Sequence, residues 1–310
     1  MFIGERIINK FMKIIVTGSL GHISKPLTRE LAEKGHQVTV ISSRTERQKD
    51  IEALGAIAAV GSLEDADFLT STFTGADTVY CMVPPSNYFD HNLDLVAYYR
   101  RIGGNYVQAV ERTGVKRVVN LSSIGAHLDK GNGILLGAHN VENILNELSP
   151  EVAVTHMRPV YFYYNLYGFA ETIKNRGIIA ANYGGENKIT MVSPTDIAAA
   201  IAEEIETPSV GRKVRYVASD ERTGNETASV LGAAIGKPDL KWVIISDEQM
   251  QTGLEASGLS PRIAAGLVEM YASLQSGLLM QDYERHKPIA LGKVKLEDFA
   301  KEFAAVFNRQ

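Results

Sequence analysis

Two adjacent hydroxyl side chains, Ser122 and Ser123, follow the run VKRVVN, which is typical of a buried strand. Hydroxyl groups at the end of such a strand are suited to hold or move a proton. The segment 121–145 contains no tyrosine, however, and its single lysine, Lys130, lies in a Gly/Asn-rich loop. It is therefore open which group, if any, performs proton transfer.

The sequence TGSLGHIS spaces Gly18, Gly21 and Ser24 three residues apart, directly after the run KIIV. One glycine permits a tight turn, and the next lets a pyrophosphate approach the backbone. The helix that follows would present free N–H groups and the positive end of its dipole. The pattern indicates nucleotide binding, with a plain strand-to-helix turn as the alternative.

A second polar group, Ser42, Ser43 and Arg44, ends the run QVTVIS. NAD-binding sites place Asp or Glu here to bind the ribose hydroxyls. A cation with two hydroxyls suits a 2′-phosphate better than a bare diol. The sequence therefore favours NADP (NADPH) over NAD, unless these residues form an ordinary solvated basic turn.

Short apolar runs alternate with helical periods in the first half of the chain. The runs cover residues 13–18, 37–42, 56–62, 77–83, 116–123 and 151–160. They lack strict alternation, as expected for strands buried on both faces, and most of the helical segments end near a glycine. This order predicts an α/β fold with a doubly wound parallel sheet.

The chain is expected to divide into unequal parts. Residues 1–11 are interpreted as a leader, which could be disordered. Residues 12–160 are predicted to form a nucleotide-binding domain. Residues 161–310 are predicted to form mainly a smaller α/β substrate-binding part, with some segments returning to the first domain. Within it, residues 295–307 show the apolar period of an amphipathic helix.

Composition excludes several classes of protein. The net charge of −4 provides no field for a nucleic acid backbone, and no apolar run reaches the length of a membrane span. The single cysteine, Cys81, excludes a disulfide framework and favours the cytoplasm. No His/Asp/Glu cluster has the spacing of metal ligands, so we expect no metal.

Together these stretches resemble the NmrA-like family of atypical short-chain dehydrogenases/reductases. The matching pieces, between residue 14 and about residue 245, are VTGSLGHIS, MVPP, RVVNLSSIGA, HNVENIL, MRPVYFYYNL, MVSPTDIAAAIAEEI and LGAAIGKPDLKW. The resemblance implies a Rossmann domain with a small C-terminal substrate domain. The family includes NADPH-dependent quinone and azo-compound reductases, other reductases, and regulators that bind the dinucleotide as redox sensors.

The resemblance also implies contacts with the cofactor along one edge of the sheet. They involve the pyrophosphate (Gly18, Ser19, Leu20, Gly21, His22, Ile23), the adenosine ribose (Ser43, Arg44), the adenine (Gly61, Ser62, Leu63), the nicotinamide-side ribose (Val83, Pro84, Pro85), and the nicotinamide (Ser122, Ser123, Pro159, Val160, Tyr161, Phe162).

The Tyr-x-x-x-Lys pair of common short-chain dehydrogenases is absent. Aligning Glu142 with the glutamate of the family puts the tyrosine position at Ile134 and the lysine position at Ala138. Neither side chain ionises, so ordinary carbonyl reduction or alcohol oxidation is not expected. A quinone or azo acceptor takes hydride over a low barrier and needs mainly to be stacked on the nicotinamide.

Two residues are candidates for a catalytic role. His139 has a suitable pKa range for a proton donor, although it could be an ordinary, partly exposed helix histidine. Tyr161 offers a flat wall and a hydroxyl, although it could simply pack in the core. The helical stripe that contains Tyr271 is likewise either core or substrate-facing.

Two functions remain open from the sequence. The first is an NAD(P)H-dependent reductase of quinone-like or other electrophilic small molecules, acting by direct hydride transfer. The alternative is a non-catalytic NAD(P)-sensing regulator that binds a protein partner. A homodimer is possible with either function, and nucleic acid or membrane partners are not expected.

Overall fold

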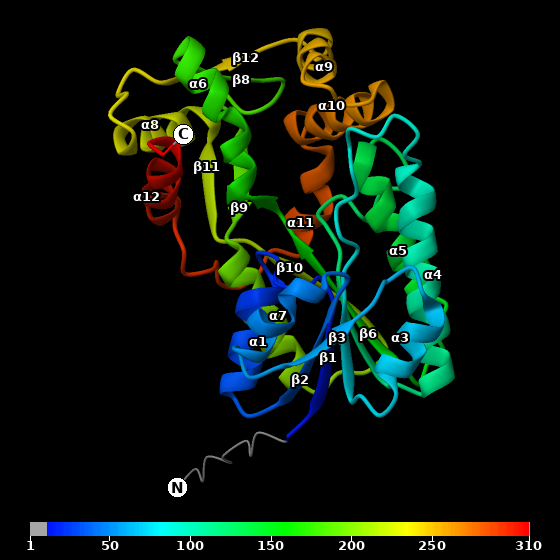
Figure 1. Cartoon of the computed structure of the whole chain (residues 1–310). Coiled ribbons are helices and arrows are strands. Elements are labelled where there is room, and N and C mark those ends of the chain that lie inside the picture. The colour runs from blue at the N-terminus through cyan, green and yellow to red at the C-terminus, as the bar shows by residue number, and fades with distance from the viewer. Residues whose placement is uncertain (1–10, 310) are drawn as a thin grey trace, which may run out of the picture.

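The computed structural model describes residues 11–309, so most of the proposed leader, residues 1–10, lies outside the described residues. The chain builds a seven-stranded sheet with helices on both faces, and a smaller part at the carboxyl ends of the strands (Figure 1). The doubly wound Rossmann fold predicted from the sequence is therefore confirmed.

All neighbours in the large sheet run parallel. In spatial order its strands are β10 (Arg212–Val217), β6 (Ala153–Pro159), β5 (Arg117–Leu121), β4 (Thr78–Cys81), β1 (Lys13–Val16), β2 (Gln37–Ser42) and β3 (Ile57–Val60). The strand order reverses direction between β1 and β4, and ligands of such sheets bind outside the carboxyl ends at this point.

Helices cover both faces of this sheet (Figure 1). One face carries α1 (Ser24–Glu33) and α7 (Pro194–Glu206), and the other carries α3 (Ala66–Phe73), α4 (Leu95–Thr113) and α5 (Leu136–Asn146). The short η1 (Thr45–Arg47) and α2 (Gln48–Glu52) connect β2 to β3. Two hydrophobic cores fill the layers on either side of the strands.

A later segment of the chain returns to the large sheet. Strand β10 pairs with β6, and α7 packs beside α1. On α7 the buried carboxylate of Glu204 accepts hydrogen bonds from Arg117 (2.8 Å) and Thr155 (3.0 Å) of the sheet. The boundary expected at residues 160 and 161 stays a prediction.

The smaller part contains two short sheets and its own core. Its strands are β7 (Tyr161–Phe162), β8 (Ile178–Ala181), β9 (Lys188–Val192), β11 (Asp220–Thr223) and β12 (Lys241–Ile244). Its helical elements are η3 (Tyr163–Phe169), α6 (Ala170–Arg176), α8 (Gly224–Ala234), α9 (Asp247–Ala256), α10 (Pro261–Gln275), η4 (Leu278–Met280), α11 (Gln281–Arg285) and α12 (Leu296–Phe307).

The C-terminal helix α12 lies beside α8 in the smaller part (Figure 1). Its apolar face, predicted from the sequence, is buried: Leu296, Phe299, Phe303 and Phe307 all lie in this core. Among residues 11–309 no single helix is long and apolar enough to cross a membrane. The helical segments 261–275 and 278–285, which are bent by 70° relative to each other, would be long and apolar enough only if taken together.

Candidate functional site

The loop after β1 turns sharply where the sequence places its glycines. Gly18 has φ +86°, and Ser19 is the one non-glycine residue in 11–309 with positive φ, at +54°. A Cβ added to Gly18 would lie 2.7 Å from Ser24 Oγ and 2.9 Å from Met82 Sδ. The turn therefore requires glycine at position 18 for both backbone and space.

The N-terminus of α1 is open to an anion. No side chain caps it and no acidic residue lies in its first turn, while Ser24 donates its hydroxyl to the carbonyl of Thr17 (2.8 Å). At Gly21 an added Cβ would meet only the carbonyl oxygen of Gly18, at 3.2 Å. Free N–H groups, a positive dipole end and this open approach fit a pyrophosphate.

The end of β2 separates a structural serine from two exposed side chains. Ser42 is buried, accepts a hydrogen bond from Ser19 Oγ (2.9 Å), and accepts another from the backbone N–H of Arg44 (3.1 Å). Ser43 and Arg44 are exposed. Within the described chain the guanidinium of Arg44 has no protein partner, so it is available to a phosphate.

The other predicted cofactor residues follow the carboxyl ends of neighbouring strands. Gly61 follows β3, and a Cβ there would lie 2.5 Å from the ring of Phe68. Pro84 follows β4 and accepts a hydrogen bond from the hydroxyl of Tyr98 (3.2 Å). Val160 follows β6 and is buried. These segments lie at one edge of the sheet, as expected, but their contacts with a cofactor stay a prediction.

Ser122 takes part in a buried ion network that sequence reasoning missed. Its hydroxyl donates to Glu142 (2.5 Å), and Glu142 accepts two hydrogen bonds from Arg158 (2.9 and 2.6 Å). Arg158 also pairs with Asp282 of α11 (2.9 Å). Burial alone would raise the pKa of Glu142, but the hydrogen bonds and charge of Arg158 hold it below its ordinary value. In the sequence analysis Glu142 was used only to locate the positions of the absent Tyr–Lys pair, and its ion pair with Arg158 was not predicted.

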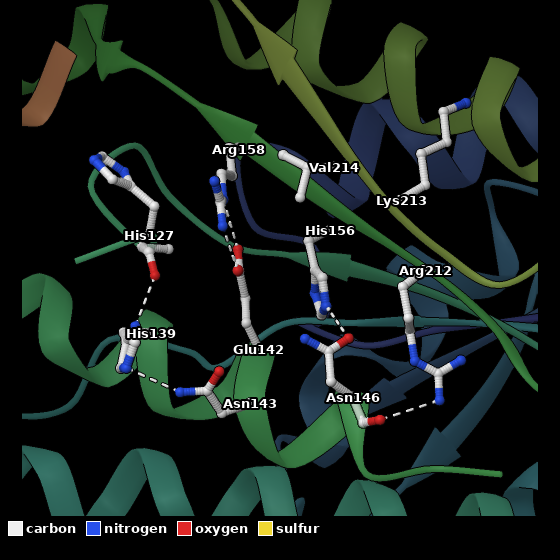
Figure 2. Close-up of a pocket in the computed structure, with 11 residues that line it drawn as sticks. His127, His139, Glu142, Asn143, Asn146, His156, Arg158, Arg212, Lys213 and Val214 are labelled. Atoms are coloured by element: carbon white, nitrogen blue, oxygen red, sulfur yellow. Dashed lines mark hydrogen bonds and ion pairs between the residues drawn. The ribbon is translucent and has the colours of Figure 1, made fainter. Parts of the chain in front are cut away.

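His139 lines a cavity of about 290 Å³ between α5 and strands β6 and β10 (Figure 2). Its Nδ1 lies 2.9 Å from the carbonyl oxygen of Ala126, so this nitrogen must donate. Its Nε2 lies 2.9 Å from the amide nitrogen of Asn143 and therefore accepts. Both ring nitrogens are thus engaged by protein groups, and the role of His139 as a proton donor stays a prediction.

Tyr161 lies in different surroundings, among aromatic side chains of the smaller part. Its hydroxyl is 2.8 Å from the hydroxyl of Tyr183, which follows β8, and the ring of Tyr183 stacks on Tyr271 of α10 (4.7 Å between centroids). The structure does not bring His139 and Tyr161 into one hydrogen-bond network. The apolar stripe on α10 had indicated Tyr271 as a candidate to face the substrate, whereas no sequence pattern had indicated Tyr183.

The loop between β4 and α4 carries a further tyrosine to this cluster. The carbonyl of Tyr88 accepts a hydrogen bond from the N–H of Ser260 (3.4 Å), next to the start of α10. Burial, together with the proximity of Tyr88, raises the pKa values of Tyr164 and Tyr271 to about 12. Neutral aromatic side chains from the loop, from η3 and from α10 therefore lie close together near the carboxyl ends of the strands.

Helix α10 packs against the position where the tyrosine of the absent Tyr–Lys pair would lie. Ile134 lies in η2 (Gly133–Leu135), which packs against α10. A Cβ added to Gly266 of α10 would lie 2.9 Å from Ile134 Cγ2, and one added to Gly133 would collide with the carbonyl of Gly266. Helix α10 thus fills the space beside position 134.

The family model that matches residues 10–276 is the NmrA-like family. The chain belongs to this family. It is 26% identical over 302 residues to an NAD(P)H azoreductase of Xenophilus azovorans, covering 95% of this chain and 99% of that relative.

Two solved structures show the same fold. An NADPH-dependent quinone oxidoreductase of Escherichia coli, complexed with NADPH, has a TM-score of 0.78 at 20% identity and covers 93% of this chain and 99% of its own. The triphenylmethane reductase of Citrobacter sp., complexed with NADP(H), has a TM-score of 0.73 at 17% identity, covering 94% and 99%.

Proposed function

We propose that this chain is an NAD(P)H-dependent reductase of quinone-like or other electrophilic small molecules, with NADPH preferred over NADH. The observation that carries the proposal is the uncapped, glycine-lined N-terminus of α1 at the switch point of the sheet, beside Tyr164, whose ring stacks on His22 of the loop. The names of the similar proteins, an azoreductase and a quinone oxidoreductase, support it.

The protein groups that would hold the dinucleotide are mostly backbone. The N–H groups of residues 20, 22 and 23 would bind the pyrophosphate, since those of Ser19 and Gly21 already donate to the carbonyls of Ile41 and Gly18. Ser43 with Arg44 would bind a 2′-phosphate. The segments after β4 and β6 would flank the nicotinamide. When bound, the reduced nicotinamide supplies hydride, and the residues of this chain position the acceptor against it.

The class of acceptor follows from the absence of the Tyr–Lys pair and from the presence of stacked tyrosine rings. Ile134 and Ala138 cannot pass a proton to a carbonyl oxygen, so an acceptor with a high barrier to hydride addition would not react. Flat tyrosine rings can stack an aromatic acceptor. Quinones and azo compounds meet both conditions.

The sensor hypothesis rests on the missing pair alone, and the similar proteins named above are reductases. We place the protein in the cytoplasm on the strength of its single, buried thiol, Cys81.

The test measures NADPH consumption with a panel of quinones and azo dyes, beside titrations of NADPH and NADH in the absence of acceptor. We expect turnover with several quinones and none with simple secondary alcohols and NADP. Tight dinucleotide binding without turnover on any acceptor would overturn the reductase proposal and favour the sensor.

A further inference from the structure

The hydroxyls of Tyr161 and Tyr183 form an isolated pair. They lie 2.8 Å apart, and within residues 11–309 neither has another hydrogen-bond partner. Only one hydrogen can lie between the two oxygens, because each hydroxyl has a single hydrogen. The other O–H of the pair therefore has no acceptor in the protein.

The pair is held rigidly. Tyr183 is 1% exposed, and its ring contacts Tyr271 face to face and Trp242 edge to face. The indole N–H of Trp242 also donates to the backbone carbonyl of Tyr183. Tyr161 is partly exposed whereas Tyr183 is buried, so a ligand would reach the pair from the side of Tyr161.

Both hydroxyls stay protonated over a wide pH range. Burial raises the pKa of Tyr161 well above its ordinary value, with a further contribution from Tyr271. Burial likewise raises the pKa of Tyr183, with Tyr161 and Tyr271 adding to the effect. A hydroxyl with a raised pKa transfers its proton poorly, but it remains a hydrogen-bond donor over a wide pH range.

The pair lies next to the segment that is expected to flank the nicotinamide. Tyr161 follows Pro159 and Val160 at the carboxyl end of β6, the segment expected to flank the nicotinamide. Tyr271 extends the same aromatic surface from α10, next to the loop of Tyr88.

We propose that the Tyr161–Tyr183 hydroxyl pair donates a hydrogen bond to the oxygen or nitrogen atom of the acceptor that becomes negatively charged on reduction. The proposal rests on the proposed reductase function. A quinone that gains a hydride becomes a hydroquinone monoanion, and water then delivers the single proton that completes the hydroquinone. The oriented O–H stabilises the charge as it develops, which the missing Tyr–Lys pair cannot do.

The experiment compares Tyr161→Phe, Tyr183→Phe and the double variant with wild type. The matched control is Tyr163→Phe, which removes the neighbouring hydroxyl that donates to the carbonyl of Val294. One readout is kcat with a quinone. The other is the affinity for para-nitrophenolate, a stable oxyanion that absorbs visible light.

We expect kcat to fall by roughly 10²-fold in either single variant and no further in the double variant, because both residues serve one hydrogen bond. Nitrophenolate affinity should fall by about tenfold or more, and the control should match wild type. NADPH affinity should not change in Tyr183→Phe or in the control.

The two proposals fail separately. If wild type turns over and the variants keep their kcat, the donor pair is wrong and the reductase stands. If wild type does not bind nitrophenolate, or binds it equally without the hydroxyls, the donor pair is wrong as well. If wild type reduces no acceptor but loses nitrophenolate binding with either hydroxyl, the reductase proposal fails and the oxyanion site stands.

Discussion

Arg44 is the residue on which the choice between the two dinucleotides depends. It is exposed after β2, and within the described residues its guanidinium makes no hydrogen bond or ion pair with the protein. We expect Arg44→Ala to weaken NADPH binding by roughly 1.5–3 kcal/mol, the range of a charge-assisted hydrogen bond, and to leave NADH binding unchanged. Calorimetric titration measures both. Arg47→Ala, which removes an exposed pair with Asp50, is the control; equal affinities in wild type and Arg44→Ala would make Arg44 an ordinary surface charge.

Glu142 is the buried carboxylate that neutralises Arg158 beneath the site. Removing its charge by Glu142→Gln leaves Arg158 with only part of its buried ion network, so we expect a loss of about 3 kcal/mol in the free energy of unfolding. Glu147→Gln, at an exposed position after the same helix, should change it by less than about 0.5 kcal/mol. Urea denaturation measures both, and similar losses would mean that the network contributes little.

The same carboxyl gives this stability a pH dependence with a definite sign. Its pKa is lower in the folded state than in the unfolded chain, where a glutamate has a pKa of about 4.3. The contribution is therefore complete above the unfolded value and is lost as the pH falls through the folded value. Denaturation of wild type and Glu142→Gln should accordingly converge at acid pH.

At the scale of elements, the start of α1 sets dinucleotide binding. Gly21→Val would place a branched side chain where the backbone is open to an anion, and the carbonyl oxygen of Gly18 is the one atom that its Cβ would meet. We expect a folded protein that no longer binds NADPH, with Gly21→Ala in between. Circular dichroism and a binding titration decide this. Normal affinity in the folded valine variant would remove the phosphate-loop assignment.

The contact between η2 and α10 makes the absent pair hard to restore. Ile134→Tyr with Ala138→Lys would supply the missing side chains, but Gly266 of α10 lies against position 134. We expect a destabilised protein without carbonyl reductase activity, measured by thermal unfolding and by turnover of simple ketones. Efficient ketone reduction would show that α10 can move to accommodate the tyrosine, and that the chain lacked only these two side chains for carbonyl reduction.

The sequence predicted the elements that bury long apolar runs and missed those that do not. The strands of the large sheet were predicted because Val and Ile fill them and glycines end the intervening helices. Strand β11 has the sequence DERT, so no hydrophobic pattern marks it, and β7 has two residues. The ion network was missed because Glu142, Arg158 and Asp282 meet only through the tertiary fold.

At the scale of the whole molecule, the smaller part has a core of its own, although its elements η4 and α11 also contribute Leu279 and Tyr283 to a core of the large sheet. The aromatic column of Tyr163, Phe299, Phe303 and Phe307 belongs to the core of the smaller part. We expect Phe303→Ala to cost about 3–5 kcal/mol in the free energy of unfolding, as for other buried aromatics. At low temperature the folded variant should still bind NADPH, because the phosphate loop rests on the other core. Loss of NADPH binding without loss of stability would contradict this separation.

Strand β10 has a consequence for how the protein can be synthesised. The ribosome makes β6 first, and the strand that covers its outer edge begins only at Arg212. A nascent chain that ends near residue 200 therefore exposes an unpaired edge of buried residues, which is a template for pairing with other chains. We expect such stalled chains to be retained by chaperones, and to be released once residue 217 has left the exit tunnel.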